Sequence, residues 1–223
     1  MTAGTLEGGS VRATVGEYSL AEPRAHRIFD VSLAVLALVV SWPLWILVAI
    51  AILLEDGRPI FFAQRRWGKD KRKIVVYKFR SMITVGGHSE AVQASNNDPR
   101  ITRVGRILRA SSLDELPQVI SILRGDMSWV GPRALPINEV QAREAGRQVE
   151  DEAVRGFAER CSVKPGLTGI AQIYAPRDVP RRQKFRYDLL YIRQRGLWLD
   201  VRLIVLSLWI TARGAWGRAG RKV

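Results

Sequence analysis

Residues 31–54 read VSLAVLALVVSWPLWILVAIAILL, an uncharged run of 24 residues between Asp30 and Glu55. A straight helix of that length would measure about 36 Å, which exceeds the hydrocarbon core of a bilayer, about 30 Å thick. The run begins too late and is too long to be the apolar region of a cleavable signal peptide. It therefore predicts a membrane segment, with a buried helix of a soluble protein as the alternative.

The middle of this run predicts a break. Pro43 removes a backbone donor and its ring clashes with the carbonyl of Val39, which kinks a helix. Ser41 is close enough to hydrogen-bond a freed carbonyl. Trp42 and Trp45 also lie at the midpoint, whereas the tryptophans of a simple span prefer the two interfaces. We therefore expect Ser41 and Pro43 to form a membrane hinge.

Basic residues flank both ends of the run. Arg24 and Arg27 precede it, and seven basic residues follow it between Arg58 and Lys73. By the positive-inside rule, both ends are expected on the cytoplasmic side. Each half, about 18 Å long, would then enter one leaflet and return, as a re-entrant helix-break-helix. An ordinary span with a mild proline kink is the alternative.

Composition limits the remaining possibilities. The chain has 223 residues, 47% of them apolar, and 35 Lys and Arg against 21 Asp and Glu give a formal charge of +14. This suits one compact domain with an anchor and predicts an anionic partner, which could be nucleic acid, an anionic membrane surface or a phosphorylated small molecule. Cys161, His26 and His88 are the only cysteine and histidines. Their scarcity argues against disulfides, zinc sites and a Ser-His-Asp triad, and favours catalysis by carboxylates or a hard cation.

The rest of the sequence predicts an α+β fold that is mainly helical. Residues 59–62 and 74–79 are β-prone and predict a small hairpin, and residues 84–100 have the composition of a loop. Apolar residues recur at helical spacing over residues 101–109, 113–123, 137–152 and 182–193. Residues 196–210 predict a C-terminal helix that lies at the membrane interface beside a basic tail, or that packs into the core.

The predicted organisation has four parts. They are a flexible tail at residues 1–22, a re-entrant anchor at 23–57, a cytoplasmic catalytic domain at 58–195, and a C-terminal interfacial helix with a basic tail at 196–223. Interfacial amphipathic helices are expected around the compact catalytic domain.

The densest polar segment is RASSLDELPQ at residues 109–118. Asp114 and Glu115 open an apolar helical stretch there, where free N–H groups and the helix dipole favour carboxylates and bound phosphates. An ionised Asp114 could serve as a nucleophile or a cation ligand. Ser112 and Glu115 also match a capping box, which would make the acids structural. Pro117 argues against that cap, because its missing N–H would cost a hydrogen bond in the helix.

Two further segments combine turns with polar residues. In RGDMSWVGPR, at residues 124–133, Arg133 projects from a constrained loop and suits a phosphate. In KPGLTGIAQ, at residues 164–172, closely spaced glycines let the backbone approach a ligand. Neither segment is a Walker A or Rossmann fingerprint.

Five motifs occur in a specific order. They are KFRSM at residues 78–82, SLDELPQ at 112–118, GDMSWVGPR at 125–133, PGLTGIAQ at 165–172 and YDLLYI at 187–192. Together they resemble the bacterial sugar transferases, the monotopic phosphoglycosyl transferases, over roughly residues 25–212. The resemblance implies transfer of a sugar 1-phosphate from a UDP-sugar to a polyprenyl phosphate, normally undecaprenyl phosphate, with release of UMP. This is the first membrane step in assembling an exopolysaccharide, capsule, O-antigen or glycoprotein glycan.

The resemblance also implies site residues. Asp114 would attack the phosphate that bears the sugar and form a covalent phosphosugar enzyme. Glu115 would accept the proton of the polyprenyl phosphate or bind Mg²⁺, and the two carboxylates together are the expected metal ligands. The residues expected to bind substrate phosphates are Arg109, Arg133, Lys78, Arg80 and Gln172.

The resemblance has a departure at the anchor. The family usually carries serine directly before the breaking proline, whereas Trp42 lies between Ser41 and Pro43 here, which leaves the hinge geometry open. Larger relatives add several N-terminal spanning helices, so the chain resembles the minimal catalytic form. The implied location is the cytoplasmic face of the bacterial cytoplasmic membrane, with a UDP-sugar and a polyprenyl phosphate as partners and no nucleic acid. The sugar, the final glycan and the oligomeric state stay open.

Two other functions are compatible with the residues alone. A membrane-tethered module that binds anionic lipid or nucleic acid would need the basic residues but not Asp114 or Glu115. A lipid pyrophosphate hydrolase could use the same carboxylates with Mg²⁺ and would release inorganic phosphate.

Overall fold

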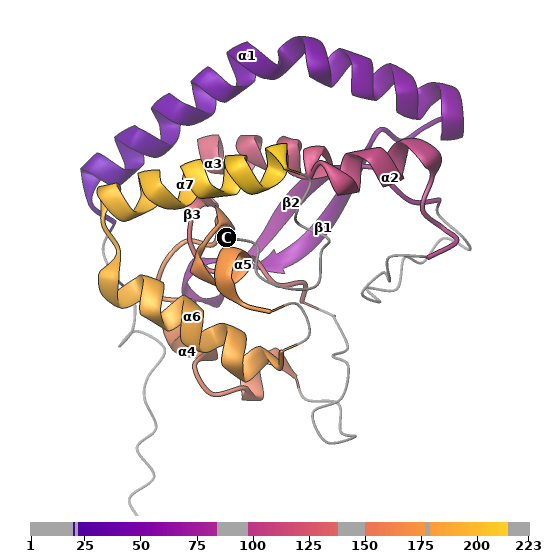
Figure 1. Cartoon of the computed structure of the whole chain (residues 1–223). Coiled ribbons are helices and arrows are strands. Elements are labelled where there is room, and N and C mark those ends of the chain that lie inside the picture. Colours follow the sequence, from indigo (N-terminus) through magenta and orange to yellow (C-terminus); the bar gives the residue numbers. More distant parts are fainter. Residues whose placement is uncertain (1–19, 21, 84–97, 138–149, 177–178, 214–223) are drawn as a thin grey trace, which may run out of the picture.

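The structure is a computed structural model that describes residues 20, 22–83, 98–137, 150–176 and 179–213. Its elements are α1 (Arg24–Asp56), β1 (Phe61–Trp67), η1 (Lys69–Lys71), β2 (Lys73–Phe79), α2 (Arg103–Ala110), η2 (Leu113–Gln118), α3 (Val119–Arg124), β3 (Ser128–Val130), η3 (Asp151–Ala153), α4 (Phe157–Arg160), β4 (Gly166–Thr168), α5 (Ile170–Tyr174), α6 (Arg181–Gln194) and α7 (Leu197–Ala212), where η marks a 3₁₀ helix. The predicted mainly helical fold with a small hairpin and a long apolar N-terminal helix is confirmed (Figure 1).

Helix α1 forms an arch over the rest of the molecule (Figure 1). It is a single helix of 33 residues with Pro43 inside it, so the expected helix-break-helix is instead a continuous, curved helix. A proline removes one hydrogen bond of the ladder, and the bonds on either side keep the two halves joined. The Ser41 hydroxyl, expected at a freed carbonyl, accepts a hydrogen bond of 3.0 Å from the indole N–H of Trp45.

The N-terminal end of α1 is attached to the body of the molecule by polar contacts. The Arg27 guanidinium donates to the carbonyls of Ile122 and Leu123 at 2.6 and 2.7 Å, where a cation is favoured at the last turn of α3. Asp30 is 2% exposed, and its carboxylate accepts a hydrogen bond from the backbone N–H of Trp129.

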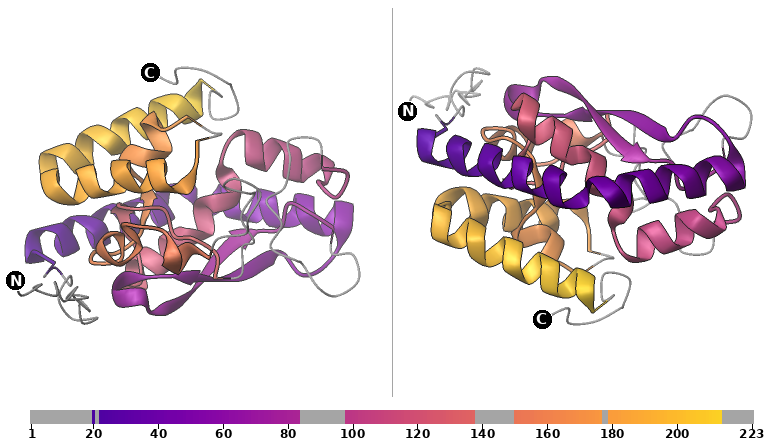
Figure 2. Two further views of the ribbon diagram at one scale, coloured as in Figure 1. Left: turned by 90° about the horizontal axis from the view of Figure 1, so that it is seen from below. Right: turned by 90° about the horizontal axis from the view of Figure 1, so that it is seen from above.

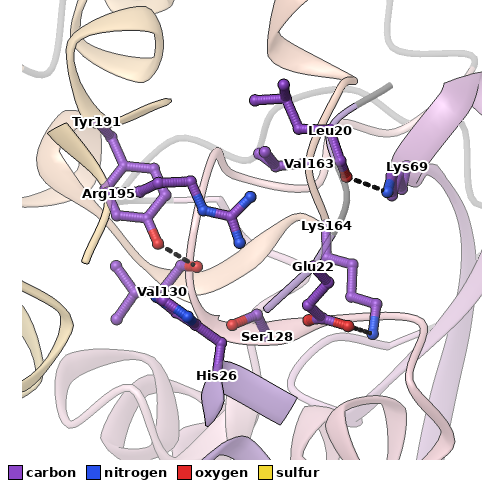
Figure 3. Close-up of a pocket in the computed structure, with 10 residues that line it drawn as sticks. All are labelled: Leu20, Glu22, His26, Lys69, Ser128, Val130, Val163, Lys164, Tyr191 and Arg195. Atoms are coloured by element: carbon purple, nitrogen blue, oxygen red, sulfur yellow. Dashed lines mark hydrogen bonds and ion pairs between the residues drawn. The ribbon is translucent and has the colours of Figure 1, made fainter. Parts of the chain in front are cut away.

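A cavity of about 10 Å³ lies beside this end of α1. Figure 3 shows Lys164 paired with Glu22 across it, and the Tyr191 hydroxyl donating to the carbonyl of Val130 at 3.1 Å. The volume suits a single water molecule, and the lining is polar enough to bind one. The first contact joins the residues before α1 to the segment before β4, and the second joins α6 to β3.

The C-terminal end of α1 is held as firmly as the N-terminal end. Arg80 donates to the carbonyls of Asp56 and Gly57 at 2.6 and 2.8 Å, and it pairs with the Asp56 carboxylate at 2.9 Å. The Glu55 carboxylate accepts hydrogen bonds of 2.7 and 2.8 Å from the first two backbone N–H groups of α2. Glu55 therefore caps α2, and both ends of the apolar helix are attached to one folded body.

Between its ends, α1 buries only a narrow stripe. Ala34 packs against Val76 of β2 and Ile122 of α3 in the main core, whereas Val40 and Leu54 are 71% and 83% exposed. Within the described residues, α1 alone is long and apolar enough to cross a membrane. An exposed apolar surface of this size is typical of a lipid contact.

Two small sheets support the chain beneath the arch. Strands β1 and β2 form the predicted hairpin, in antiparallel register from Phe61 opposite Phe79 to Trp67 opposite Lys73. The first strand was predicted at residues 59–62, whereas β1 begins at Phe61 and continues to Trp67. Strands β3 and β4 pair in parallel, which no local pattern predicted. A Cβ on Gly166 would lie 2.0 Å from the backbone nitrogen of Gly131, so this pairing needs glycine.

The predicted helices are found with some changes. Helices α2, α6 and α7 match the stretches at 101–109, 182–193 and 196–210, whereas 113–123 is divided into η2 and α3. Of the stretch predicted helical at 137–152, residues 138–149 lie outside the described residues and residues 151–153 form η3. Of the predicted flexible tail at 1–22, residues 1–19 and 21 also lie outside them, as do residues 214–223 and most of the predicted loop at 84–100. The described residues Leu20 and Glu22 are bound to Lys69 and Lys164, so this end of the predicted tail is attached to the body.

The sequence left open whether the C-terminal helix lies at the membrane interface or packs into the core, and α7 has both an exposed apolar surface and a buried one. It buries Leu203 and Ile210 in the core, and it exposes 82% of Trp198 and 64% of Leu208. In Figure 1, α7 and α2 lie at the same level beneath α1, and Figure 2 shows them one after the other along one side of it. The three helices, each of which exposes large apolar residues, thus lie on one side of the molecule.

Candidate active site

The Asp114-Glu115 pair is not explained by a helix cap. The chain enters η2 through Ser112 in the left-handed conformation, at φ 56°. Among the residues that the structure describes, no backbone N–H donates a capping hydrogen bond to the Ser112 side chain. The capping box predicted by the sequence is therefore not formed, and the Glu115 side chain is used elsewhere.

Both carboxylates face basic side chains from distant segments. Lys78 of β2 places its Nζ 2.6 Å from Oε1 of Glu115 and 3.8 Å from Oδ2 of Asp114. Arg133, which follows β3, donates from Nη2 to the same Glu115 oxygen at 2.8 Å. One oxygen of Glu115 is therefore shared by two cations, and charge-assisted bonds of this kind fix its position.

This arrangement separates the ionisation of the two acids. Burial, together with the negative charge of Glu115, raises the pKa of Asp114 above its usual range, against the opposing charge of Lys78. Burial also acts to raise the pKa of Glu115, but the charges of Arg133 and Lys78 outweigh it and hold that pKa well below its usual range. Adjacent acids with pKa values moved in opposite directions are typical of groups with different catalytic roles.

The carboxylates also fit a magnesium ion shared with a substrate. The described residues contain no group of three or more His, Cys, Asp and Glu side chains that could hold a metal by themselves. Magnesium, however, is usually held by one or two carboxylates together with substrate phosphates. Asp114 and Glu115 can supply the carboxylates, and Glu115 would have to share an oxygen with its two basic partners.

The other predicted phosphate ligands fall in three places. Arg109 of α2 contacts the Met82 sulfur at 3.3 Å rather than either carboxylate, although its charge acts to lower the pKa of Asp114. The structure does not bring Arg80 to the pair, because its guanidinium is bound at the end of α1. Gln172 of α5 donates to the carbonyl of Gly131 at 3.5 Å, beneath the turn that carries Arg133.

A buried ion pair behind Arg133 was not predicted from the sequence. Arg160 donates from Nη2 to the carbonyl of Arg133 at 2.6 Å and from Nε to the Asp188 carboxylate at 2.9 Å. Both side chains are nearly inaccessible, at 3% and 4% exposure. Asp188 lies in the YDLLYI motif and could have been suspected, but nothing in the sequence around Arg160 predicts this contact.

A second missed residue is Arg66 of β1. It is 6% exposed and donates to the carbonyl of Ala134 at 2.8 Å. Its positive charge also lowers the pKa of Glu115. The sequence marked Arg66 only as one of several basic residues after the apolar run.

The chain matches known proteins over most of its length. The "Bacterial sugar transferase" family matches residues 21–214. A UDP-glucose:undecaprenyl-phosphate glucose-1-phosphate transferase of Xanthomonas campestris pv. campestris is 42% identical over 189 residues, which cover 82% of this chain and 38% of that protein. The protein of the same name from Escherichia coli (strain K12) is 41% identical over 187 residues, which cover 82% of this chain and 39% of that protein.

The length of the relatives varies. The two transferases are matched over less than two fifths of their own length. The exopolysaccharide production protein PSS of Rhizobium leguminosarum bv. phaseoli is 41% identical over 184 residues, which cover 80% of this chain and 90% of that protein. Because the family match spans nearly all the described elements, the chain belongs to the bacterial sugar transferase family.

Proposed function

We propose that this chain transfers a sugar 1-phosphate from a UDP-sugar to undecaprenyl phosphate and releases UMP. The observation that carries the proposal is the convergence of Lys78 and Arg133 on the Asp114-Glu115 pair. Phosphoryl transfer between two anionic substrates needs such positive charge around the reacting phosphate. The names of the relatives support the same reaction, and UDP-glucose is the first donor to test.

In the first step, the Asp114 carboxylate attacks the phosphorus that bears the sugar. A bond forms between a carboxylate oxygen and that phosphorus, and the bond to the bridging oxygen of the diphosphate breaks. UMP leaves with the electron pair, and the sugar phosphate stays on Asp114 as an acyl phosphate. The raised pKa of Asp114 makes its carboxylate a stronger nucleophile once it is ionised.

In the second step, a phosphate oxygen of undecaprenyl phosphate attacks the same phosphorus and restores the Asp114 carboxylate. The product is an undecaprenyl diphosphate sugar. Glu115 is ionised and bound by two cations, so it is a weak proton acceptor and is better suited to positioning Lys78 and Arg133. A phosphate monoester with a second pKa near 6 is mostly a dianion at neutral pH and needs no base.

Magnesium bound by the two carboxylates and the substrate phosphates would neutralise charge that develops on the transferred phosphoryl group. Arg109, whose charge acts to lower the pKa of Asp114, would add a fixed positive charge. Both contributions act on the phosphates of either substrate, so one site can serve a soluble donor and a lipid acceptor in turn.

We also propose that α1 enters one leaflet of the cytoplasmic membrane and returns, with the catalytic residues on the cytoplasmic side. The attachment of both helix ends to one body supports this, because a spanning helix would separate its ends by the membrane thickness. The lipid acceptor would then present its phosphate at headgroup depth, beside the site.

The test is an intact-mass measurement on protein in nanodiscs with Mg²⁺ and a panel of UDP-sugars, without acceptor. Wild type is expected to gain the mass of one sugar phosphate, and Asp114→Asn is expected to gain none. Asp70→Asn is the matched control, since Asp70 adopts a left-handed conformation at φ 54° that asparagine also tolerates.

The outcomes separate the parts of the proposal. UMP release with acceptor but no adduct would keep the transferase and reject the covalent Asp114 intermediate. Release of inorganic phosphate from a lipid pyrophosphate, without transfer, would replace the proposal with a hydrolase. If neither the adduct nor UMP forms with any of the UDP-sugars tested, the proposed function would be overturned.

A further inference from the structure

A groove between α4 and α6 has no role in the proposed reaction. Its volume is about 560 Å³, which lies in the range of small-molecule sites. Arg155, Arg182, Arg186 and Arg193 line it, together with apolar residues such as Phe185 and Leu189. We propose that this groove binds a soluble organic phosphate of nucleotide size and acts as an effector site.

The arrangement of the arginines supports an anionic ligand. Arg182, Arg186 and Arg193 are spaced by four and seven residues on α6, which places them on one face of the helix. Arg155 faces them from the turn before α4, and Glu159 is the one carboxylate in the lining. The groove therefore carries a net positive charge.

The side chains of these four arginines, unlike those of neighbouring arginines, have no partner among the described residues. Arg160 is bound to Asp188 and Arg181 to Asp151. Within the described ranges, by contrast, no side-chain hydrogen bond or ion pair involves Arg155, Arg182, Arg186 or Arg193. Guanidinium groups that converge without a carboxylate partner are available for a phosphate, which they can bind in bidentate geometry.

The interior of the groove suits the organic part of such a ligand. Phe185 at its base is 2% exposed, and Leu189 and Ile192 add apolar surface beside it. An apolar base surrounded by guanidinium groups matches a ring system that carries phosphates. Inorganic phosphate alone would use only the arginines.

The groove is separate from the carboxylate pair. In Figure 1, α4 and α6 lie on the side of the molecule away from the arch of α1. No groove residue belongs to β2, η2 or the segment of Arg133. A ligand from solution can therefore reach it while α1 is in the membrane, whereas a lipid phosphate held at the membrane surface cannot.

A short path joins the groove to the candidate active site. The Arg160 guanidinium lies over the Phe185 ring, with 4.7 Å between Cζ and the ring centroid. The same guanidinium donates to the backbone carbonyl of Arg133. A ligand that presses on Phe185 would therefore act on the residue that holds the Arg133 backbone. This effector role rests on the proposed function, whereas ligand binding does not.

Binding is tested by calorimetry on purified protein without UDP-sugar, with ATP, pyrophosphate and inorganic phosphate as probes. We expect ATP to bind more tightly than inorganic phosphate, and Arg182→Gln/Arg186→Gln to weaken ATP binding about tenfold or more. Arg65→Gln/Arg72→Gln removes the same charge from exposed positions outside the groove and is expected to bind like wild type. Asp114→Asn should also bind ATP normally, which separates this site from the proposed transferase site.

Three results would overturn the site. They are failure of all three probes to bind at millimolar concentration, equal loss of binding in both double variants, and binding of a polyglutamate peptide in the groove without binding of ATP. The last would indicate a protein partner. Arg193→Gln alone is a second groove variant, which should weaken binding in the same direction.

The effector role is tested by the rate of adduct formation from a UDP-sugar. Saturating ATP is expected to change this rate at least twofold in wild type and to leave it unchanged in Arg182→Gln/Arg186→Gln. If ATP binds but does not change the rate of adduct formation, the effector role would be overturned and the proposed binding site would stand. Absence of an adduct in all conditions would instead reject the proposed function.

Discussion

At the scale of single residues, Lys78 connects the two acids of the candidate site. Its ammonium group touches Glu115 and lies within 4 Å of Asp114, so its charge favours ionisation of both. Burial lowers the pKa of Lys78 itself, against the opposing charges of Glu115 and Asp114. The three groups therefore titrate as one unit, and a change at Lys78 should be visible in the pH dependence of the reaction.

Replacing Lys78 with methionine should reduce the rate of adduct formation about 100-fold. The sign of the pH effect follows from charge: Lys78 lowers the pKa of Asp114, so its removal raises that pKa further. Because the nucleophile must be ionised, the rising limb of the pH-rate profile should move to higher pH. The measurement is the single-turnover adduct rate across pH.

Lys73→Met is the control for this change, because Lys73 lies exposed on the same strand. Its pH profile should match that of wild type. If the pH-rate profile of Lys78→Met is not shifted, whatever the absolute rate, an electrostatic role for Lys78 would be contradicted.

The Asp188→Asn change should destabilise the protein strongly. It leaves the Arg160 charge buried without its carboxylate, and breaking a buried pair costs about 3–5 kcal/mol of unfolding free energy. Thermal denaturation in detergent should show a midpoint lower by roughly 10 °C. Asp188→Asn/Arg160→Gln should recover part of the loss, and a midpoint unchanged in the single variant would show that the pair is not needed for stability.

At the scale of elements, α1 joins a lipid-facing surface to the site. The guanidinium of Arg80 attaches its C-terminal end, and Arg27 attaches its N-terminal end to α3. Helix α3 continues directly from η2, which carries the acids. The depth of α1 in the membrane therefore sets the height of the carboxylates above the lipid.

A labelling experiment decides the path of α1. Ala25 and Arg58 are exposed just inside and just beyond its two ends, and each can be changed to cysteine after Cys161, which is buried, is replaced by serine. We expect a membrane-impermeant maleimide to label neither cysteine in spheroplasts and both after lysis. Labelling of one cysteine only would indicate a spanning helix, and labelling of both from outside would place the ends on the opposite face.

At the scale of the whole molecule, three helices share the apolar side. Alongside α1, α2 exposes 68% of Ile107 and α7 exposes 82% of Trp198. Tryptophan favours the headgroup region of a membrane, and the +14 charge of the chain favours an anionic surface. We expect α2 and α7 to lie at the interface and to set the orientation of the catalytic body.

Changing Trp198 and Leu208 of α7 to glutamine should impair the lipid step selectively. Removing two exposed apolar side chains weakens interfacial contact, so the kcat/KM for undecaprenyl phosphate should fall about tenfold. Adduct formation from a soluble UDP-sugar should be unchanged. Leu190→Gln on α6, away from α1, is the control, and an equal loss in both steps would contradict a membrane role for α7.

Local patterns in the sequence were sufficient to predict the helices and strands whose formation depends on residues close by in the sequence. The length and apolarity of residues 31–54 predicted the long helix, period and composition predicted the hairpin and α2, α6 and α7, and the order of five motifs identified the family and the Asp114-Glu115 pair. The signals for the helices and the hairpin are each contained within a few helical turns or strand residues, and the order of the motifs is read along the chain, so no knowledge of the fold was needed.

Tertiary structure alone decided which distant groups meet. The parallel pairing of β3 with β4, the use of Arg80 at the end of α1, and the Arg160 contact with Arg133 join residues 23 to 38 positions apart. Such contacts depend on how the whole chain closes around its core, and local spacing carries no record of that closure. For the same reason, the sequence identified the acids, whereas only the fold places Asp114 where burial raises its pKa and Glu115 where Arg133 and Lys78 lower its pKa.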